Sequence, residues 1–290
     1  LFIGATDVGG GTGTSLGQIV AEELNVSLGT VRVVIADTEL TPFDHGTYSS
    51  RVTPYVGAAV KLAAIDARRQ IAAKAAQLWN VPVEGIRFAR GKISADGQRP
   101  FIWTEILART QTAEIVGVGA SQSKRLWAED ASKQTKNASA PGWPYGAQAV
   151  EVAVDRETGV IKLVRVASAH DVGKAINPLA VTGQIEGGIM MGLGYALLEG
   201  LLFDEGKITN ASFADYKIPT MRDIPAATPM IVEKNYDSEP YGAKGVGEMS
   251  VFGIAPAVAN AVAGLTGVRI KDLPLSAEKL REQLKASKEK

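Results

Sequence analysis

Glu248 lies in the stretch YGAKGVGEMS, residues 241–250, which combines three glycines with one lysine and one carboxylate. A carboxylate on so flexible a segment is either incidental or placed there to contact another group. The simpler interpretation is a surface turn, because glycine supplies backbone angles that other residues avoid and a neighbouring glutamate is merely solvated. The choice between these interpretations depends on the other motifs of the chain.

A glycine cluster in DVGGGTGTSLGQ, residues 7–18, lies between an expected strand and an expected helix. In that position free backbone N–H groups and the helix dipole favour an anion such as phosphate. No Gly-Lys-Ser/Thr follows, and the G-x-G-x-x-G spacing ends on Thr14 or Leu16 instead of glycine. Asp37, which closes the next expected strand, still imitates the ribose-binding acid of a dinucleotide fold, so a dinucleotide stays an alternative to a different anionic ligand.

Two further stretches carry hydrogen-bonding groups. HGTYSSRVT, residues 45–53, clusters hydroxyls with Arg51, whose guanidinium can pair bidentately with a phosphate. The alternative is a helix cap with a surface arginine. GQIEGG, residues 183–188, places Gln184 and Glu186 on an expected helix with five glycines between 183 and 194. Each helical glycine costs about 1 kcal/mol against alanine, so we expect another group to approach that backbone closely.

Composition excludes several classes of protein. The 31 basic and 31 acidic residues balance, so no net field attracts nucleic acid or an anionic membrane. The absence of cysteine excludes disulfides, iron-sulfur ligation and a thiol nucleophile within the chain, and it favours the cytoplasm. His45 and His170 stand alone, without metal-ligand spacing. We find no apolar run of the roughly 18 residues that a membrane span requires.

The order of elements predicts an α+β fold with two mixed α/β lobes, residues 1–135 and 145–290, joined through the polar stretch 129–144. Helices are predicted over residues 14–24, 56–79, 177–200, 251–267 and 275–290, with another between 101 and 118. A hairpin is predicted to turn at Asp96-Gly97, and two strands at residues 147–173 to turn between 155 and 159. The opening LFIGATDV is expected to be a strand already under way, in a fragment or in one subunit of a divided enzyme.

These motifs occur together in a known order. The glycine loop, YSSRVT, DVGKAINPLAVTGQIEGGIMMGLGYALLE, SFADYKIPTMRDIP and GAKGVGE follow one another over nearly the whole chain. In this the sequence resembles the second molybdopterin-binding domain of the large subunit of molybdenum hydroxylases, the xanthine dehydrogenase and aldehyde oxidoreductase family. The resemblance implies an oxidoreductase subunit that hydroxylates a heteroaromatic or aldehyde carbon with water-derived oxygen.

The resemblance assigns roles to particular residues. Glu248 matches the family's general base, which takes a proton from the attacking oxygen, and Gln184 matches a glutamine that touches the pterin. The remaining cofactor-binding positions that it implies lie in three glycine- or serine-containing segments: Gly9, Gly10, Gly11, Thr12, Gly13 and Thr14; Ser49, Ser50 and Arg51; and Gly245, Val246 and Gly247. Many relatives read MGQG where this chain reads VGGG, so Gly10 stands where a cofactor-binding glutamine is common.

The resemblance also implies cofactors and partners. The cofactor is molybdenum-molybdopterin, whose cytosine dinucleotide form a bacterial origin would favour. Partner chains are a second molybdopterin-binding subunit, as in the divided nicotinate dehydrogenase, an iron-sulfur subunit with 2Fe-2S clusters and a subunit with FAD. The substrate is a small molecule that the sequence does not identify, with His45, Tyr48 and Tyr241 as candidate pocket residues. The alternatives are a non-catalytic module that holds or matures molybdopterin, and a dinucleotide-dependent dehydrogenase.

Overall fold

The computed structural model of the chain describes residues 1–121 and 143–288. Contacts divide it into unit 1, Leu1–Trp143 with Asn235–Gly245, and unit 2, Pro144–Lys234 with Val246–Lys290. Both units mix helices and strands, in agreement with the predicted α+β class. The units differ from the predicted lobes in that residues 235–245 return to unit 1. Most of the predicted connection, residues 129–142, lies outside the described residues.

In unit 1 a short parallel pair leads into helix α1. Strands β1 (Phe2–Ile3) and β2 (Val34–Ile35) pair over two residues each, although longer strands were predicted. Helix α1 (Thr12–Leu24) buries Leu16 and Ile19, as the spacing of its apolar residues predicts, and Asn25 ends it in the left-handed conformation. The 3-10 helix η1 (Leu28–Thr30) follows.

Helix α2 (Gly57–Trp79) is the long helix of unit 1 and begins after the π-helical turn η2 (Val52–Val56). Its alanines let an extended segment lie against it: a β-carbon built on Gly117 or Gly119 would overlap the carbonyl oxygens of Ala63 and Ala59. The small apolar residues of α2 therefore serve close packing.

The outer part of unit 1 contains the predicted hairpin, in which two strands pair across Asp96-Gly97, and a further turn before it that was not predicted. After η3 (Val83–Gly85), strands β3 (Arg87–Ala89), β4 (Lys92–Ser94) and β5 (Phe101–Ile102) pair antiparallel in that order. The first turn is at Arg90-Gly91, where both residues have positive φ, and Asp96-Gly97 belongs to the second connection. Helix α3 (Trp103–Arg109) follows, and Ile71, Ile93, Phe101 and Ile106 form the local core.

Residues 235–245 are anchored to α1 and α2 by polar contacts. The Tyr241 hydroxyl donates a hydrogen bond to Glu23 Oε1 (2.6 Å), and Lys61 Nζ lies 2.6 Å from Glu239 Oε2. Burial, followed by the hydrogen bond to Glu23, raises the pKa of the Tyr241 hydroxyl far above its ordinary value. Tyr241, a candidate pocket residue from the sequence, thus has its hydroxyl engaged inside unit 1.

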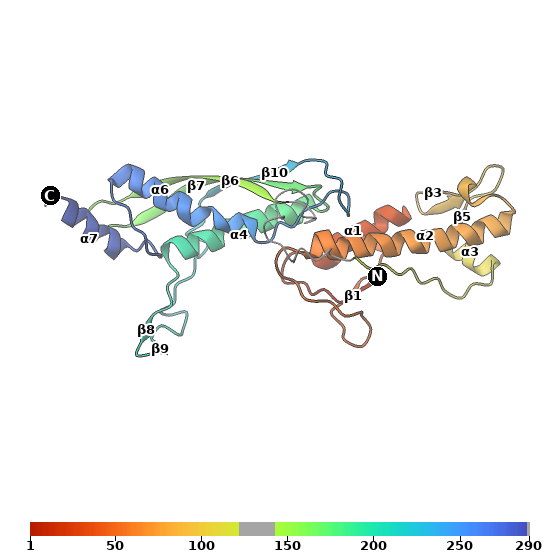
Figure 1. Ribbon diagram of the computed structural model, residues 1–290, viewed down its shortest axis with the longest axis horizontal. Helices are drawn as coiled ribbons and strands as arrows, with labels where there is room; N and C mark the ends of the chain where they lie inside the picture. Colours follow the sequence, from red (N-terminus) through yellow and green to blue (C-terminus); the bar gives the residue numbers. More distant parts are fainter. Residues whose placement is uncertain (122–142, 289–290) are drawn as a thin grey trace, which may run out of the picture. The chain divides into compact units, whose positions relative to one another are not determined.

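Unit 2 is built on the sheet β10-β7-β6 (Figure 1). Strands β6 (Tyr145–Val154) and β7 (Ile161–Gly173) pair antiparallel through the predicted turn, and β10 (Ala226–Glu233) pairs parallel with β7. The parallel pair is joined through helix α4 (Pro178–Leu197), which Asn177 caps by accepting a hydrogen bond from the Ala180 N–H (3.0 Å). Asn177 and Pro178 therefore begin the helix where the sequence predicts.

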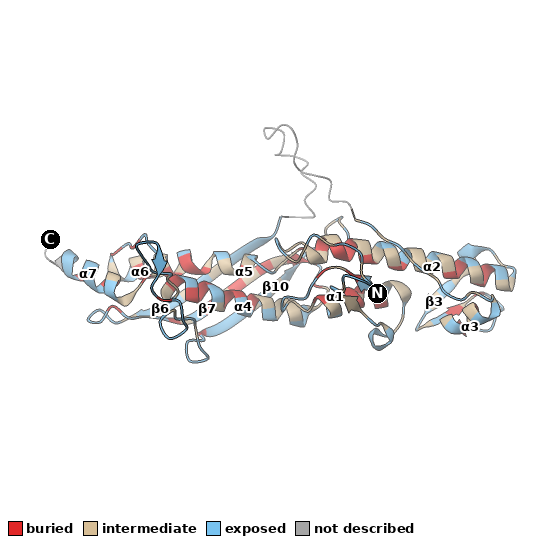
Figure 2. Cartoon of the chain, turned by 90° about the horizontal axis from the view of Figure 1, so that it is seen from below, coloured by how far each residue is buried: buried red, intermediate tan, exposed pale blue. Residues whose placement is uncertain are grey.

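The core of unit 2 lies between α4, helix α6 (Ile254–Thr266) and the sheet, and buried residues follow α4 in Figure 2. The predicted helix 251–267 is divided at Gly253 into α5 (Met249–Phe252) and α6. Helix α7 (Ala277–Lys288) closes the described chain and buries Leu280 and Leu284 in the same core. Strands β8 (Phe203–Asp204) and β9 (Lys207–Ile208) form a hairpin that extends away from the sheet (Figure 1).

The window Met249–Thr266 corrects one expectation about apolar length. It spans 18 residues with a mean hydropathy of 1.5, so by length and composition alone it is able to cross a membrane. The core helix of a soluble protein passes the same test. Here the window consists of two helices separated at Gly253, and Ile254, Val258 and Val262 are buried in the core of unit 2. This packing favours a pair of core helices.

The glycines of α4 give a matched pair of substitutions. A β-carbon on Gly192 would lie 2.5 Å from Ile254 Cβ, whereas one on Gly187 meets nothing within 4 Å. We expect Gly192→Ala to lower the free energy of unfolding by about 1–3 kcal/mol through overpacking. Gly187→Ala should raise it by about 0.5–1 kcal/mol through helix propensity. Chemical denaturation of both variants measures the difference, and equal stabilities would contradict the close packing of α4 on α6.

Candidate cofactor site

The turn of the glycine loop in unit 1 is held by hydrogen bonds to Asp7, and several of its glycines border open space. Asp7 Oδ1 accepts hydrogen bonds from the N–H groups of Gly9 (2.9 Å) and Gly11 (3.2 Å). Gly9 and Gly11 have φ of 102° and 71°, which glycine adopts without strain, and β-carbons on Gly9, Gly10 or Gly13 would meet nothing within 4 Å. The loop therefore presents backbone to open space at the start of α1, whose first N–H groups have no partner within the helix.

Asp7 was missed by the sequence reasoning. It occupies two of the amides that the glycine cluster was expected to offer, so anion binding would rely on Gly10 and the first turn of α1. The signal was available, because an aspartate followed two residues later by glycine is typical of a side chain that closes its own turn.

The second predicted segment, Ser49 to Arg51, has an unusual backbone. Ser49 and Ser50 both have positive φ, 51° and 50°, although neither is glycine. Such consecutive left-handed residues cost free energy and persist only where surrounding contacts hold them, often at ligand sites. Arg51 Nη1 lies 2.8 Å from both Asp44 Oδ1 and the Gly46 carbonyl oxygen. Arg51 Nη1 thus stabilises its own loop by an ion pair with Asp44 and a hydrogen bond to the Gly46 carbonyl.

Unit 1 brings these segments together. The Thr47 hydroxyl donates to the Thr6 carbonyl (2.7 Å), which joins the serine loop to the strand that leads into the glycine loop. A β-carbon built on Gly245 would overlap the carbonyl oxygen of Ser50. The close approach of Gly245 therefore requires glycine, and the start of the GVGE segment lies against the left-handed Ser50.

Lys244 is buried in unit 1, although lysine usually keeps its charge in solvent. It is 4% exposed, its Nζ donates to the Trp143 carbonyl (2.8 Å), and it lies 3.7 Å from the centroid of the Tyr236 ring. The aromatic face and the carbonyl both stabilise the ammonium. Lys244 thereby fixes two points of unit 1 from which the chain passes into unit 2, after Trp143 and after Gly245.

Glu248 lies in unit 2, where it is the N-cap residue of α5. Gly247 and Glu248 are exposed, while Val246 packs against the core of unit 2. The Val251 N–H donates to the Glu248 carbonyl (3.2 Å), and α5 has no side-chain cap. The carboxylate is therefore presented at the start of a helical turn with its backbone tied to that turn.

Gln184 lies close to this turn through Ser250. The Ser250 hydroxyl donates to the Gln184 carbonyl (3.1 Å), and a β-carbon on Gly188 would overlap Ser250 Oγ. Gly188, the last glycine of the GQIEGG motif, is thus needed so that α5 can approach α4. Unit 2 brings Gln184 and the Glu248 turn together, and unit 1 brings together the glycine loop, the serine loop and Gly245.

A buried polar chain continues behind Ser250 and was not predicted. Gln148 Nε2 lies 2.7 Å from the Ser250 carbonyl oxygen and 2.9 Å from Ser168 Oγ, which in turn lies 2.8 Å from His170 Nε2. Ser168, His170 and Ser250 are at most 1% exposed, and burial lowers the pKa of His170. His170, one of the two histidines of the sequence, is thus a core residue.

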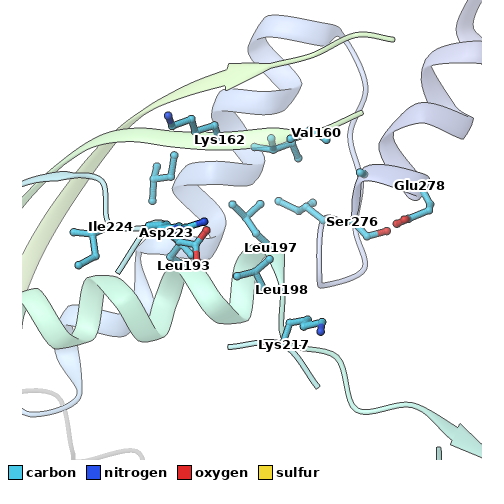
Figure 3. Close-up of a pocket in the computed structure, with 15 residues that line it drawn as sticks. Val160, Lys162, Leu193, Leu197, Leu198, Lys217, Asp223, Ile224, Ser276 and Glu278 are labelled. Carbon is cyan, nitrogen blue, oxygen red and sulfur yellow. The ribbon is translucent and has the colours of Figure 1, made fainter. Parts of the chain in front are cut away.

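Neither the acidic residues nor the cavity of unit 2 suggests another centre. Within residues 1–121 and 143–288 no group of three or more His, Asp or Glu is placed to hold a metal ion. A cavity of about 620 Å³ in unit 2 is lined by Leu193 and Leu197 of α4 and by Lys162, Lys217 and Asp223 (Figure 3). Leu193 follows Gln184 by nine residues, roughly 13 Å along α4, so this cavity is distinct from the Glu248 turn.

Comparison with known proteins places the chain in a family. The model of the molybdopterin cofactor-binding domain matches residues 1–225. The chain therefore belongs to the molybdopterin cofactor-binding domain family, as the order of its motifs predicted. The dinucleotide alternative is not supported, because Asp37 instead accepts hydrogen bonds from the N–H groups of Glu39 and Leu40 in its own turn.

Named relatives come from several enzymes. The chain is 34% identical over 97% of its length to the putative xanthine dehydrogenase molybdenum-binding subunit XdhA of Escherichia coli (strain K12), and 32% identical over 96% of its length to the 6-hydroxypseudooxynicotine dehydrogenase complex subunit gamma of Paenarthrobacter nicotinovorans. These matches cover 37% and 35% of the relatives. The chain thus spans little more than a third of their length.

Solved structures agree with the fold. Quinoline 2-oxidoreductase from Pseudomonas putida 86 matches with a TM-score of 0.82 and 25% identity over 97% of this chain and 36% of its own. The Cu,Mo-CO dehydrogenase matches with a TM-score of 0.80 and 27% identity over 97% of this chain and 36% of its own. The α+β fold is therefore that of molybdenum enzymes.

Proposed function

We propose that this chain forms part of the molybdenum subunit of a hydroxylase, which binds molybdenum-molybdopterin and adds water-derived oxygen to a heteroaromatic or aldehyde carbon. The observation that carries the proposal is the contact of Gly245 with Ser50, because it joins the GVGE segment to the serine loop. Two motifs that are nearly 200 residues apart in sequence meet where the resemblance implies cofactor contacts. Family membership and an oxidoreductase role for the relatives XdhA and quinoline 2-oxidoreductase support it.

The residues present fit an anionic, bulky cofactor. Gly10 and Gly13 leave open space in front of backbone N–H groups at a helix start, which suits a phosphate of the pterin side chain. Ser49 and Ser50 keep a left-handed backbone in a loop that Arg51 and Asp44 hold, and Ser49 is exposed there. We assign these residues, with Gly9, Gly11, Thr12, Thr14, Gly245, Val246, Gly247 and Gln184, to cofactor binding. The cytosine dinucleotide form is proposed on the same grounds, since it adds phosphate.

Glu248 is proposed as the general base. Its carboxylate takes a proton from the water-derived oxygen that attacks the substrate carbon, and the cofactor supplies the two-electron acceptor when bound. The exposed position of Glu248 is required for this role, because a base must reach its substrate. A cofactor and substrate packed over it would desolvate the carboxylate and so raise its pKa toward the working pH.

A neutralised base gives the direct test. We expect Glu248→Gln to lower kcat of the assembled, cofactor-loaded complex by at least about 100-fold, because general-base catalysis contributes that much. Molybdenum and pterin content should be unchanged. The control Glu282→Gln removes an exposed carboxylate from α7 and should leave kcat as it is. Full activity of Glu248→Gln would reject the base and would favour the alternative of a module that only holds molybdopterin.

Gly10 offers a test of the cofactor loop with two variants of equal shape. The open space there accepts a side chain, and Gln is common at this position in the family that the sequence resembles. Gly10→Glu adds a negative charge where an anionic ligand is proposed, whereas Gly10→Gln adds none. We expect the molybdenum and pterin content of the purified complex to fall at least about fivefold in Gly10→Glu relative to Gly10→Gln, with equal melting temperatures. Equal cofactor content would contradict phosphate binding at this loop.

Partners are proposed from the name of one relative and from an exposed apolar surface. We propose a second molybdopterin-binding subunit or segment that completes the site, with 2Fe-2S and FAD chains as further members of a cytoplasmic complex. The 6-hydroxypseudooxynicotine dehydrogenase relative is itself named as a complex subunit. The arm, defined as residues 201–224, supports a partner because it exposes a row of large apolar side chains: Leu201, Leu202, Phe203, Ile208, Phe213, Ile218, Met221 and Ile224.

The arm is tested by one polar substitution. Phe203 is 62% exposed, so Phe203→Ser should leave the fold of unit 2 intact while weakening association at an apolar interface. We expect co-purification of the second molybdopterin-binding chain to fall at least about tenfold. The control Leu265→Ser alters a residue that is 52% exposed on α6 and should leave co-purification unchanged. Equal yields for the two variants would exclude the arm as the interface.

A further inference from the structure

The buried face of β7 is apolar at both ends and polar in the middle. Val166, Ser168, His170 and Val172 are all buried and alternate with outward positions, as a half-buried strand requires. The two central positions are polar, and Gly146, opposite His170 on β6, leaves room for the ring: a β-carbon there would lie 2.5 Å from His170 Nδ1. Buried polar groups cost free energy unless they are paired, so this pair is an unusual use of a core position.

The pair leads to α5 through Gln148. Gln148 faces Ser168 in the strand register, and its Nε2 donates to Ser168 Oγ (2.9 Å) and to the Ser250 carbonyl oxygen (2.7 Å). Both hydrogens of one amide are therefore used, one on the sheet and one on the helix. Ser250 then donates from its hydroxyl to the Gln184 carbonyl (3.1 Å). The polar relay, defined as His170, Ser168, Gln148 and Ser250, thus runs from the sheet to the turn that carries Glu248.

Helix α5 needs such an anchor. It has four residues, whereas an isolated helix of fewer than about 12 residues is marginal in water, and its N-cap has no side-chain hydrogen bond. Apolar packing is non-directional, so by itself it leaves the orientation of a short helix loosely defined. A hydrogen bond fixes the distance between two atoms within a few tenths of an ångström. Buried hydrogen bonds restrict the elements that they join, and here the two bonds of Gln148 tie α5 to the sheet, although His170 Nδ1 at the end of the relay has no hydrogen-bond partner.

We propose that the polar relay is a positioning device, in which Gln148 sets the orientation of α5 and thereby the direction of the Glu248 carboxylate. Its role in catalysis rests on the proposed function, whereas its role in holding the Glu248 turn does not. Gln148, Ser168 and His170 act through Ser250 and do not themselves touch reacting atoms. The relay predicts that a conservative change at Gln148, which bonds to Ser250 and not to reacting atoms, alters turnover more than binding.

Hydrogen exchange tests the positioning without any assay of activity. Gln148→Met keeps the length of the side chain and removes both hydrogen bonds, so the peptide containing residues 246–252, with the Val251 N–H, should exchange about tenfold faster in the assembled complex. The control Thr266→Val also removes two hydrogen bonds, to the Val262 carbonyl (2.7 Å) and from the Val268 N–H (3.1 Å), at the far end of α6. It should leave exchange of 246–252 unchanged, and equal rates in both variants would overturn the proposal.

A milder variant decides the matter if Gln148→Met fails to fold. Ser168→Ala removes the partner of one Gln148 hydrogen and leaves the bond to Ser250, so exchange of the same peptide should rise about threefold. Unchanged exchange in Ser168→Ala would then overturn the relay as a positioning device.

Steady-state kinetics test the link to catalysis. In the cofactor-loaded complex we expect Gln148→Met to lower kcat about tenfold, with KM changed less than about twofold and molybdenum content unchanged, because a misdirected base affects turnover and not binding. Faster exchange with unchanged kcat would overturn the catalytic part of the proposal. Failure of the proposed function is recognised separately, by full activity of Glu248→Gln, and leaves the exchange result interpretable.

Discussion

The approach of one backbone to another at Gly245 and Ser50 is the constraint on which the arrangement of unit 1 depends. No side chain fits between the two residues, because even a methyl group on Gly245 would overlap the Ser50 carbonyl oxygen. Ser50 in turn keeps a left-handed conformation that a serine adopts only at a cost, and the brace of Arg51 on Asp44 helps to maintain it. The chain enters unit 2 directly after this contact. The position from which residues 246–248 leave unit 1 is therefore set by glycine, and Lys244 fixes the residue before it on Trp143 and Tyr236.

A glycine also permits a close backbone approach in unit 2, where Gly188 lets Ser250 lie against α4. Glycine is expensive inside a helix, and α4 contains several that would be replaced by alanine if helix stability were the sole requirement. Gly188 and Gly192 are explained by the approach of α5 and α6, whereas Gly183 and Gly187 face open space. In the proposed function the second pair faces the cofactor or a partner, which accounts for glycines that the isolated chain does not need.

Cofactor binding and catalysis make different demands on this chain. In the proposed function, the loops of unit 1 supply hydrogen-bonding groups from Gly10, from the first turn of α1 and from Ser49 to the cofactor. Unit 2 offers a single carboxylate on a short helix, which suits a step that depends on direction. The polar relay serves the proposed catalysis and not cofactor binding, because it sets the direction of the Glu248 carboxylate and adds no contact to a ligand.

The amino-acid sequence by itself determined the family, the α+β class, the helices with clear caps such as Asn177-Pro178 and the segments that carry the candidate site. These follow from local patterns: apolar spacing, capping residues and glycine clusters act over a few positions. Only the tertiary structure decided that residues 235–245 return to unit 1, that Lys244 is buried over Tyr236, that Asp7 occupies two loop amides and that Gln148, Ser168 and His170 support the Glu248 turn. The physical reason is that each of these is a contact between residues distant in sequence. An isolated Gln, Ser or His carries no pattern that reveals its partner, and glycine reveals only that something approaches it, not which residue does.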